Sequence, residues 1–557
     1  MKNKRFTIAL LLLAVFALSC IGIGAFSVNT TANAATQTVD IYAINDFHGA
    51  VDKMPQIAGY LAARKAEGAV IINSGDMFQG SMESNSNYGK LLSDCMDLVG
   101  FDAFTFGNHE FDWGLDNLRN LATNSNVPFL GANIYNWNPK TRTWGDFADD
   151  LAQKYTIVET NGLKVGVIGV IGEDQITSIS SQLVQSIGFK SPLPIIKELA
   201  TELRNEQHCD VVVASVHAGP QDIVGENENY RQPSSSAGLS EYVDAVFCAH
   251  THAEQRYLVD GIPFVQGKSY GSYVSHVRLT ISNGNVSTGT YENISYNSLS
   301  NKVDSSVKST VQTMIDNSND AIREEANQVL ATIDVNLNSA TAVPRLVCNA
   351  IADYALSQGY DIALAMVNNA RNSLSRGDVT YTSLYEAIPF DNTVYIAKVS
   401  GKDILNEAKY DSNSIWRVSG MPIQDDDTLY TIAVIDYLLY HQNNRRNYNY
   451  FPSAFTSDFE PIALEKPGVV AYNYRFITRD FLLSQDSINT DMYTKDNIRT
   501  DKSQLTRSVD LPLTNITPTP GLPVLAIVLI AVGAAVIVVA AVVVVVVVVA
   551  KRKRNQQ

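Results

Sequence analysis

The sequence predicts an α/β (α+β) fold, because strand-like and helix-like segments alternate along its first half. From Thr38 to about Leu279, short runs rich in valine and isoleucine alternate with polar loops and helix-like segments. Continuous apolar strands of this kind are buried on both faces, so helices must cover the outside of the sheets. The clearest runs are Val39 to Ile44, Ala69 to Ile72, Asp102 to Phe106, Val165 to Ile171, Asp210 to Val216 and Asp244 to Cys248.

The N-terminal end is typical of a secretory signal peptide. Three basic residues precede an apolar stretch from Phe6 to about Val28, and Ala32-Asn33-Ala34 places small residues before a cleavage point at Ala35. A retained membrane anchor and lipidation at Cys20 are the alternatives. Residues 1–34 are therefore expected to be removed, and residues 35–300 to form the first domain.

A long amphipathic segment separates this domain from a second one. Between Lys302 and Ile333, apolar residues recur at steps of three or four, which predicts one linking helix over residues 301–335. Residues 336–510 then form a second α+β unit. It begins with a helix from Val343 to Ser357 and continues with strands at Asp361 to Val367 and Val394 to Val399.

The C-terminal end predicts a membrane anchor. Residues 511–523 are rich in proline and form a short stiff stalk. The apolar run 524–550 has 27 residues, enough to cross a bilayer as a helix. The basic tail, residues 551–557, places this end in the cytoplasm and both domains outside, as in a single-pass type I protein of the cell membrane. A sortase-type wall signal is disfavoured, because its Thr-Gly pair is missing.

Composition excludes some classes of protein. The net charge of -15 and the pI near 5.0 argue against binding to a nucleic acid polymer, because phosphate backbones require clustered lysine and arginine. Cys95, Cys209, Cys248 and Cys348 remain after signal removal, too few for a disulfide framework. Buried thiols are the expectation.

Polar motifs follow several of the apolar runs and contain five of the eight histidines. They are Asn45-Asp46-Phe47-His48-Gly49, Gly75-Asp76-Met77-Phe78-Gln79-Gly80, Gly107-Asn108-His109-Glu110, Ser215-Val216-His217-Ala218-Gly219 and His250-Thr251-His252. Aspartate, histidine and asparagine together suit divalent ions such as Zn²⁺ or Mn²⁺. Two such ions about 3.5 to 4 Å apart can clamp an in-line phosphoryl displacement, and they need one shared ligand. Asp76 is the candidate for that bridge.

The order and spelling of these motifs resemble the calcineurin-like metallophosphoesterases, and within them the secreted 5'-nucleotidase, UDP-sugar hydrolase and 2',3'-cyclic phosphodiesterase family. The resemblance implies a four-layer α/β/β/α sandwich with two divalent metal ions. It implies that Asp46, His48, Asp76 and His252 bind one ion, that Asp76, Asn108, His217 and His250 bind the other, and that His109 and Asp112 are the catalytic pair.

The resemblance continues into the second unit through Asn368-Asn369-Ala370-Arg371 and Pro389-Phe390-Asp391-Asn392. It implies that this unit holds the nucleoside, with Asn368 at the substrate site and Arg371 on the phosphate; a plain surface arginine is the alternative. Relatives stack the base between two aromatic rings beside a Gly-Gly-Asp-Gly loop, which is absent here. Tyr437 and Trp416 are the candidate rings, and the alternative for both is a place in the core.

The expected function is therefore that of a membrane-anchored extracellular phosphoesterase that converts nucleotides to nucleoside and phosphate. Its expected partners are a nucleotide or related small phosphoester and the membrane, through the C-terminal helix. One alternative keeps the metal centre but acts on 2',3'-cyclic nucleotides or UDP-sugars. Another is a surface binding protein without turnover.

Overall fold

The computed structural model describes residues 36–226, 232–299, 302–443, 447–456, 458–469, 472–485 and 487–511. Within these ranges, no helix combines the length and apolar character needed to cross a bilayer. The predicted signal peptide (1–34), the predicted membrane segment (524–550), the basic tail (551–557) and all but Leu511 of the predicted stalk lie outside the described residues.

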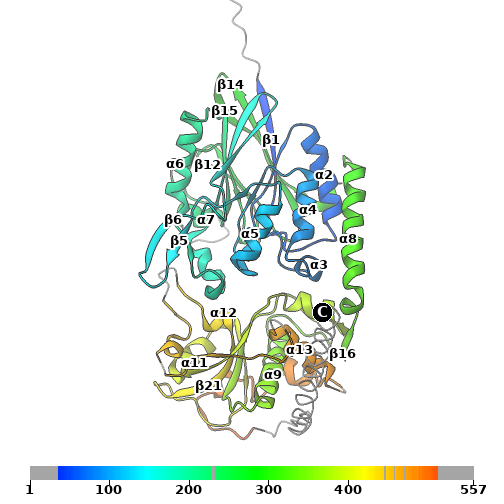
Figure 1. Ribbon diagram of the computed structural model, residues 1–557, viewed down its shortest axis with the longest axis vertical. Helices are drawn as coiled ribbons and strands as arrows, with labels where there is room; N and C mark the ends of the chain where they lie inside the picture. The colour runs from blue at the N-terminus through cyan, green and yellow to red at the C-terminus, as the bar shows by residue number, and fades with distance from the viewer. Residues whose placement is uncertain are drawn as a thin grey trace, which may run out of the picture.

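Two six-stranded sheets form the first unit (Figure 1). In spatial order the first contains β15 (Asn285–Ser295), β14 (Tyr273–Ser282), β1 (Gln37–Ile44), β2 (Val70–Asn73), β3 (Ala103–Thr105) and β4 (Phe129–Leu130). The second contains β12 (Glu254–Val259), β13 (Ile262–Gly267), β11 (Ala245–Cys248), β10 (Val211–His217), β8 (Leu163–Ile171) and β7 (Tyr155–Thr160). The four strands β1 to β4 run parallel, as do β8, β10, β11 and β13.

The sheets pack face to face, with helices outside both. Side chains of β1 such as Ile41 share a buried cluster with side chains of β8 such as Val167, which is the layer between the sheets. The helices α2 (Met54–Ala66), α4 (Lys90–Val99) and α5 (Gly114–Asn124) cover the outer face of the first sheet, and α6 (Pro192–Asn205) covers that of the second (Figure 1). The layers are therefore α/β/β/α, as the resemblance implied.

Smaller elements complete this unit. They are α3 (Met82–Asn85), α7 (Pro220–Val224) and a three-stranded sheet of β6 (Thr143–Phe147), β5 (Ile134–Asn138) and β9 (Ile187–Phe189). Cys95, Cys209, Cys248 and Cys348 are all free and buried, which confirms the expectation from sequence.

The linking helix is shorter than predicted. α8 (Ser305–Ala326) runs beside α2 and leads into the second unit (Figure 1). The Asp304 carboxylate accepts hydrogen bonds from two backbone N–H groups and caps its first turn. The prediction of one helix over residues 301–335 is wrong beyond Ala326, because residues Val329–Ile333 form β16 and pair with β18 (Gly377–Thr380). A strand partner far along the chain overrides the apolar spacing there.

The second unit is built on a five-stranded sheet. Its order is β20 (Asn413–Arg417), β17 (Leu364–Asn368), β21 (Leu429–Ile435), β19 (Val394–Ser400) and β22 (Ile462–Ala463). Its helices are α9 (Ala342–Ser357), α10 (Tyr381–Ala387), α11 (Gly401–Ala408), α12 (Asp436–Leu439), α13 (Tyr474–Leu483) and α14 (Asp491–Thr494). The predicted helix and both predicted strands of this unit are confirmed, although β17 begins at Leu364, three residues later than expected.

Candidate metal centre

The polar motifs meet because parallel strands of both sheets end at one edge. Asp46, Asp76 and Asn108 follow β1, β2 and β3, while His217 ends β10 and His250 follows β11. Ser215 of β10 lies 3.0 Å from the Ser74 hydroxyl and accepts a hydrogen bond from Thr105 at 2.7 Å, which ties the two sheets together there. Motifs spread over about two hundred residues are thus brought to one place.

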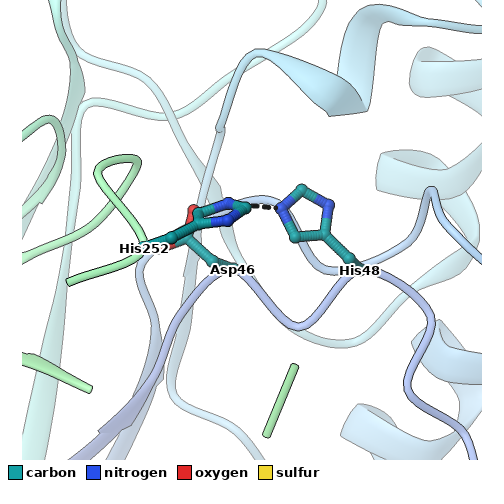
Figure 2. Close-up of side chains that lie close together, drawn as sticks. All are labelled: Asp46, His48 and His252. Carbon is teal, nitrogen blue, oxygen red and sulfur yellow. Dashed lines mark hydrogen bonds and ion pairs between the residues drawn. The ribbon is translucent and has the colours of Figure 1, made fainter. Parts of the chain in front are cut away.

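One group of ligating side chains comprises Asp46, His48 and His252, drawn in Figure 2. The Nε2 atoms of the two imidazoles lie 2.9 Å apart, and a carboxylate oxygen of Asp46 lies 3.6 Å from Nε2 of His252. The other ring nitrogen of His48 faces the Gln79 carbonyl at 3.2 Å. This backbone contact fixes the orientation of the ring and leaves Nε2 pointing into the group.

A second group comprises Asp76, His217 and His250, and Asn108 lies beside it. The Asn108 side-chain oxygen is 3.2 Å from Nε2 of His217 and 3.0 Å from Nδ1 of His250. Asp76 lies near both groups, since its Oδ2 atom is 3.2 Å from Nε2 of His217 and 3.7 Å from Nε2 of His48. The structure thus places the proposed bridging carboxylate between the two predicted ligand sets.

Five of these residues have a backbone in the left-handed region. The φ angles are 46° at Asp46, 48° at His48, 55° at Asp76, 71° at His250 and 55° at His252. Residues other than glycine rarely adopt this region, and strain of this kind gathers at functional sites. The folded chain therefore tolerates unfavourable local conformations to aim these groups inward.

The protonation of the histidines suits metal binding. Burial lowers the pKa of His250 to about 3 and that of His252 to about 4, and it holds the pKa of His48 well below its usual value. Neutral imidazoles offer the lone pair that a metal ion binds. Burial also lowers the pKa of His217, but the facing Asp76 carboxylate outweighs it and raises that pKa to about 9. A cation between Asp76 and His217 would replace the His217 proton.

The groups therefore fit divalent ions in donor chemistry, separation and orientation. The ligand atoms within each group lie within 4.8 Å of one another. Nitrogen and oxygen donors without thiolate suit Zn²⁺, Mn²⁺ and similar ions.

Sequence reasoning missed Glu110, which supports the bridging aspartate. This buried carboxylate accepts backbone hydrogen bonds from Asp76 and Gly107 on one oxygen, at 2.9 and 2.7 Å, and from Met77 on the other, at 2.9 Å. It thereby joins the loops after β2 and β3. The available signal was a charged residue within the motif Gly107-Asn108-His109-Glu110 to which no role was assigned.

Glycine is required where these loops approach β10. A side-chain carbon at Gly107 would lie 2.2 Å from Oδ1 of Asp76, and one at Gly75 would lie 2.5 Å from Nδ1 of His217. The glycines of two motifs thus make room for the aspartate and histidine of the others.

A second constellation lies next to the ligand groups. Nδ1 of His109 is 2.7 Å from a carboxylate oxygen of Asp112, and Nη2 of Arg371 lies 2.7 Å from Nε2 of His109. Burial lowers the pKa of His109, but Asp112 and Asp76 outweigh burial and raise it above its usual value. The Phe390 ring stacks on the His109 ring at 5.4 Å and lies 5.0 Å from the Arg371 guanidinium. Arg371 therefore reaches the first unit from the second.

Two cavities open from this constellation, and His109, His250 and Arg371 line both. One, of about 780 Å³, lies against residues 172–178 and 218–225 of the first unit. The other, of about 540 Å³, lies between the two units.

The predicted substrate residues divide between the cavity and the core. Asn368 and Tyr437 line the cavity between the units, together with Arg371. Trp416 does not: it is 1% exposed, lies on β20, and packs 6.0 Å from the ring of Tyr493. Trp416 thus takes the alternative place named above, because its side chain packs in the hydrophobic core of the second unit.

Two family models match the chain. The calcineurin-like phosphoesterase model matches residues 39–254, and the 5'-nucleotidase C-terminal domain model matches residues 326–408.

Individual proteins are similar over longer stretches. Protein UshA of Yersinia enterocolitica is 26% identical over 60% of this chain and 66% of its own length. The 5'-nucleotidase of Vibrio parahaemolyticus is 25% identical over 72% of this chain and 80% of its own. The crystal structure of a 5'-nucleotidase precursor from Thermus thermophilus matches with a TM-score of 0.62 at 15% identity, over 80% of this chain and 96% of that one.

Proposed function

We propose that this chain, which belongs to the 5'-nucleotidase family of calcineurin-like metallophosphoesterases, releases phosphate from nucleotides outside the cell. It is a metal-dependent phosphoric ester hydrolase, and its substrates are nucleotides. The observation that supports the proposal most is the convergence of two ligand groups on Asp76 beside His109 and Arg371.

The proposed centre holds two divalent ions, Zn²⁺ or Mn²⁺, shared by Asp76. Asp46, His48 and His252 would hold one ion, and Asn108, His217 and His250 the other. Ions bound there supply Lewis acidity and lower the pKa of bound water toward 7. The side chains themselves orient this chemistry, since backbone contacts hold the ring of His48 and the carboxylate of Glu110 holds the Asp76 loop.

His109 and Arg371 act on the phosphoryl group. Asp112 anchors Nδ1 of His109, so Nε2 points toward the substrate. The guanidinium of Arg371 lies 2.7 Å from that nitrogen, so one phosphate group can contact both. Two fixed donors at one point stabilise negative charge that develops on phosphoryl oxygens. Asn368 and Tyr437 line the adjoining cavity and would contact the nucleoside.

The location of the enzyme is proposed from its sequence. The predicted signal peptide, the apolar segment 524–550 and the basic tail together favour a single-pass type I protein of the cell membrane, with both units outside. The catalytic units would then meet extracellular nucleotides.

A second candidate function is the hydrolysis of substrates with two groups on phosphorus, such as UDP-sugars or 2',3'-cyclic nucleotides. The observation that favours it is the cavity of about 780 Å³, which shares His109 and Arg371 with the cavity between the units but extends along the first unit instead. A monoester needs one of these cavities, whereas a diphosphate with a sugar can occupy both.

The test is hydrolysis of AMP, UDP-glucose and 2',3'-cyclic AMP by the purified full-length chain in Mn²⁺ or Zn²⁺. The products measured are inorganic phosphate from AMP, UMP from UDP-glucose, and 2'- or 3'-AMP from the cyclic nucleotide. AMP turnover supports the nucleotidase, and preferential turnover of UDP-glucose or the cyclic nucleotide supports the second candidate. An Asp76→Asn variant should lose activity without unfolding, while Asp94→Asn, at an exposed side chain, should match the parent. Absence of all three hydrolysis products would leave the non-catalytic binding protein.

A further inference from the structure

We infer that Asp436 restricts the enzyme to nucleoside monophosphates, because its carboxylate lines the cavity that the extra phosphates of a di- or triphosphate would enter. The inference rests on the proposed nucleotidase function and deepens it, since it names the substrate class and one residue that sets it. It concerns phosphates that lie between the metal centre and the nucleoside.

The cavity between the units has room for a nucleoside but little positive charge. Its volume is about 540 Å³, and its lining includes Asn108, His109, His250 and Arg371 at the metal centre. Among the residues that the structure describes, Arg371 is the only lysine or arginine of this lining. A phosphate held at the metal centre by His109 and Arg371 uses that charge, so a second phosphate would meet no further lysine or arginine there.

A nucleoside diphosphate must place its second phosphate inside this cavity. Hydrolysis at the metal centre breaks the ester bond of the terminal phosphate, so the remaining phosphate lies between the centre and the ribose. In a monophosphate the ribose oxygen is bonded directly to the reacting phosphorus, and the part that enters the cavity is uncharged. The charges that line the cavity therefore discriminate between the two substrates.

Three carboxylates line the cavity, and two of them are paired with positive groups. Asp112 lies 2.7 Å from Nδ1 of His109, whose pKa is raised. Asp391 forms an ion pair with the buried guanidinium of Arg475. Within the described part of the chain, no basic side chain forms an ion pair with Asp436, whose carboxylate instead meets backbone N–H groups. Asp436 thus contributes the uncompensated negative charge of this cavity.

Backbone contacts hold Asp436 in the cavity wall. It directly follows β21 and begins α12; its N–H donates to the Thr393 carbonyl at 2.8 Å, and its carboxylate accepts the N–H of Tyr437 at 2.7 Å. Burial raises the pKa of Asp436 to about 7, and the charges of Asp112 and Asp391 add to the rise. The contribution of Asp112 puts Asp436 within electrostatic range of the catalytic pair.

An ionised Asp436 opposes a second phosphate. The side chain is half-buried, so water screens its charge less than it would on the open surface. Like charges brought together in such a site weaken binding strongly, and a change of roughly 10- to 100-fold is expected for one carboxylate facing one phosphate.

The experiment compares kcat/KM for AMP and ADP at pH 8.5, with Mn²⁺ in excess over nucleotide. Initial rates are followed as loss of the starting nucleotide, because AMP formed from ADP is itself a substrate. The parent should prefer AMP by roughly 10- to 100-fold. Asp436→Asn should remove most of this preference through a faster reaction with ADP, since asparagine keeps an acceptor for the backbone but carries no charge. The matched control is Asp427→Asn, at an exposed side chain outside the cavity, which should keep the parent's preference.

An unchanged preference in a folded Asp436→Asn variant would overturn the inference, as would a parent that hydrolyses ADP at least as well as AMP. An equal loss of both activities would identify Asp436 as a structural residue and would also overturn it. If Asp436→Asn does not fold, Asp436→Ser, which also offers an acceptor to the backbone, takes its place, and the parent's own preference is a test in either case. A parent that hydrolyses neither nucleotide would refute the proposed function instead.

Discussion

Replacing Glu110 by glutamine should weaken metal binding without removing any ligand. The carboxylate is 2% exposed and accepts three backbone N–H groups, from Asp76, Met77 and Gly107. Glutamine has one carbonyl oxygen, which can keep the two bonds to Asp76 and Gly107. Its amide nitrogen then faces the N–H of Met77, so two donors confront each other.

The expected magnitude follows from these contacts. One charge-assisted hydrogen bond is lost and one buried donor is left unpaired, which costs about 1.5 to 3 kcal/mol. Since about 1.4 kcal/mol corresponds to a factor of ten, and the loss falls on the loop that carries Asp76, metal affinity should drop roughly 10- to 100-fold.

The assay is a titration of the metal-stripped enzyme with Mn²⁺, followed by AMP hydrolysis. The Mn²⁺ concentration at half-maximal activity should rise by that factor, while the rate at saturating Mn²⁺ should recover to within several-fold of the parent. Glu67→Gln is the control, because its side chain is 58% exposed on the protein surface. A Glu110→Gln variant with the parent's Mn²⁺ dependence would show that the loop does not need this carboxylate.

Three further predictions follow from the structure. Arg371→Ala should lower kcat/KM for AMP by roughly 100-fold or more, because it removes the donor beside His109. The metal content of this variant, measured by elemental analysis, should equal that of the parent, and a loss of metal would contradict the assigned role. Chelation with EDTA should abolish turnover and added Mn²⁺ or Zn²⁺ should restore it, whereas turnover that persists after verified metal removal would contradict the metal centre. Burial raises the pKa of Glu407 from 4.5 to about 7, partly offset by the hydrogen bond from Asn413. The folded protein therefore binds this proton more tightly than the unfolded chain, so Glu407 favours folding below about pH 4.5 and loses that contribution as the pH rises to 7. Glu407→Gln should be more stable than the parent by up to roughly 3 kcal/mol in urea unfolding at pH 8 but not at pH 5.

The strands and the ligand set were accessible from sequence because both are encoded locally. Each apolar run is buried on both faces, and each motif follows its strand within a few residues, so parallel pairing brings Asp46 and Asp76 to one edge of the first sheet. His217 ends a strand of the second sheet and meets them because the two sheets pack face to face. The roles of these residues remain predictions, and the full ligand set came from the resemblance of the motifs to those of a known family.

Other features depended on contacts that no local pattern encodes. The apolar spacing at Val329 and Leu330 fits a helix as well as a strand, and the pairing with β18 decided between them. An aromatic residue in a strand can face a cavity or the core, and the packing of β20 placed Trp416 in the core.

The sequence by itself predicted which side chains form the candidate metal centre, because five ordered motifs each follow an apolar run and resemble those of a known family. Only the tertiary structure decided what surrounds that centre: Arg371 beside His109, Glu110 bound to the Asp76 loop, and Asn368 and Tyr437 in the cavity between the units. These relations join residues from different strands and from both units. They arise from packing over long separations in the chain, which spacing within a motif does not specify.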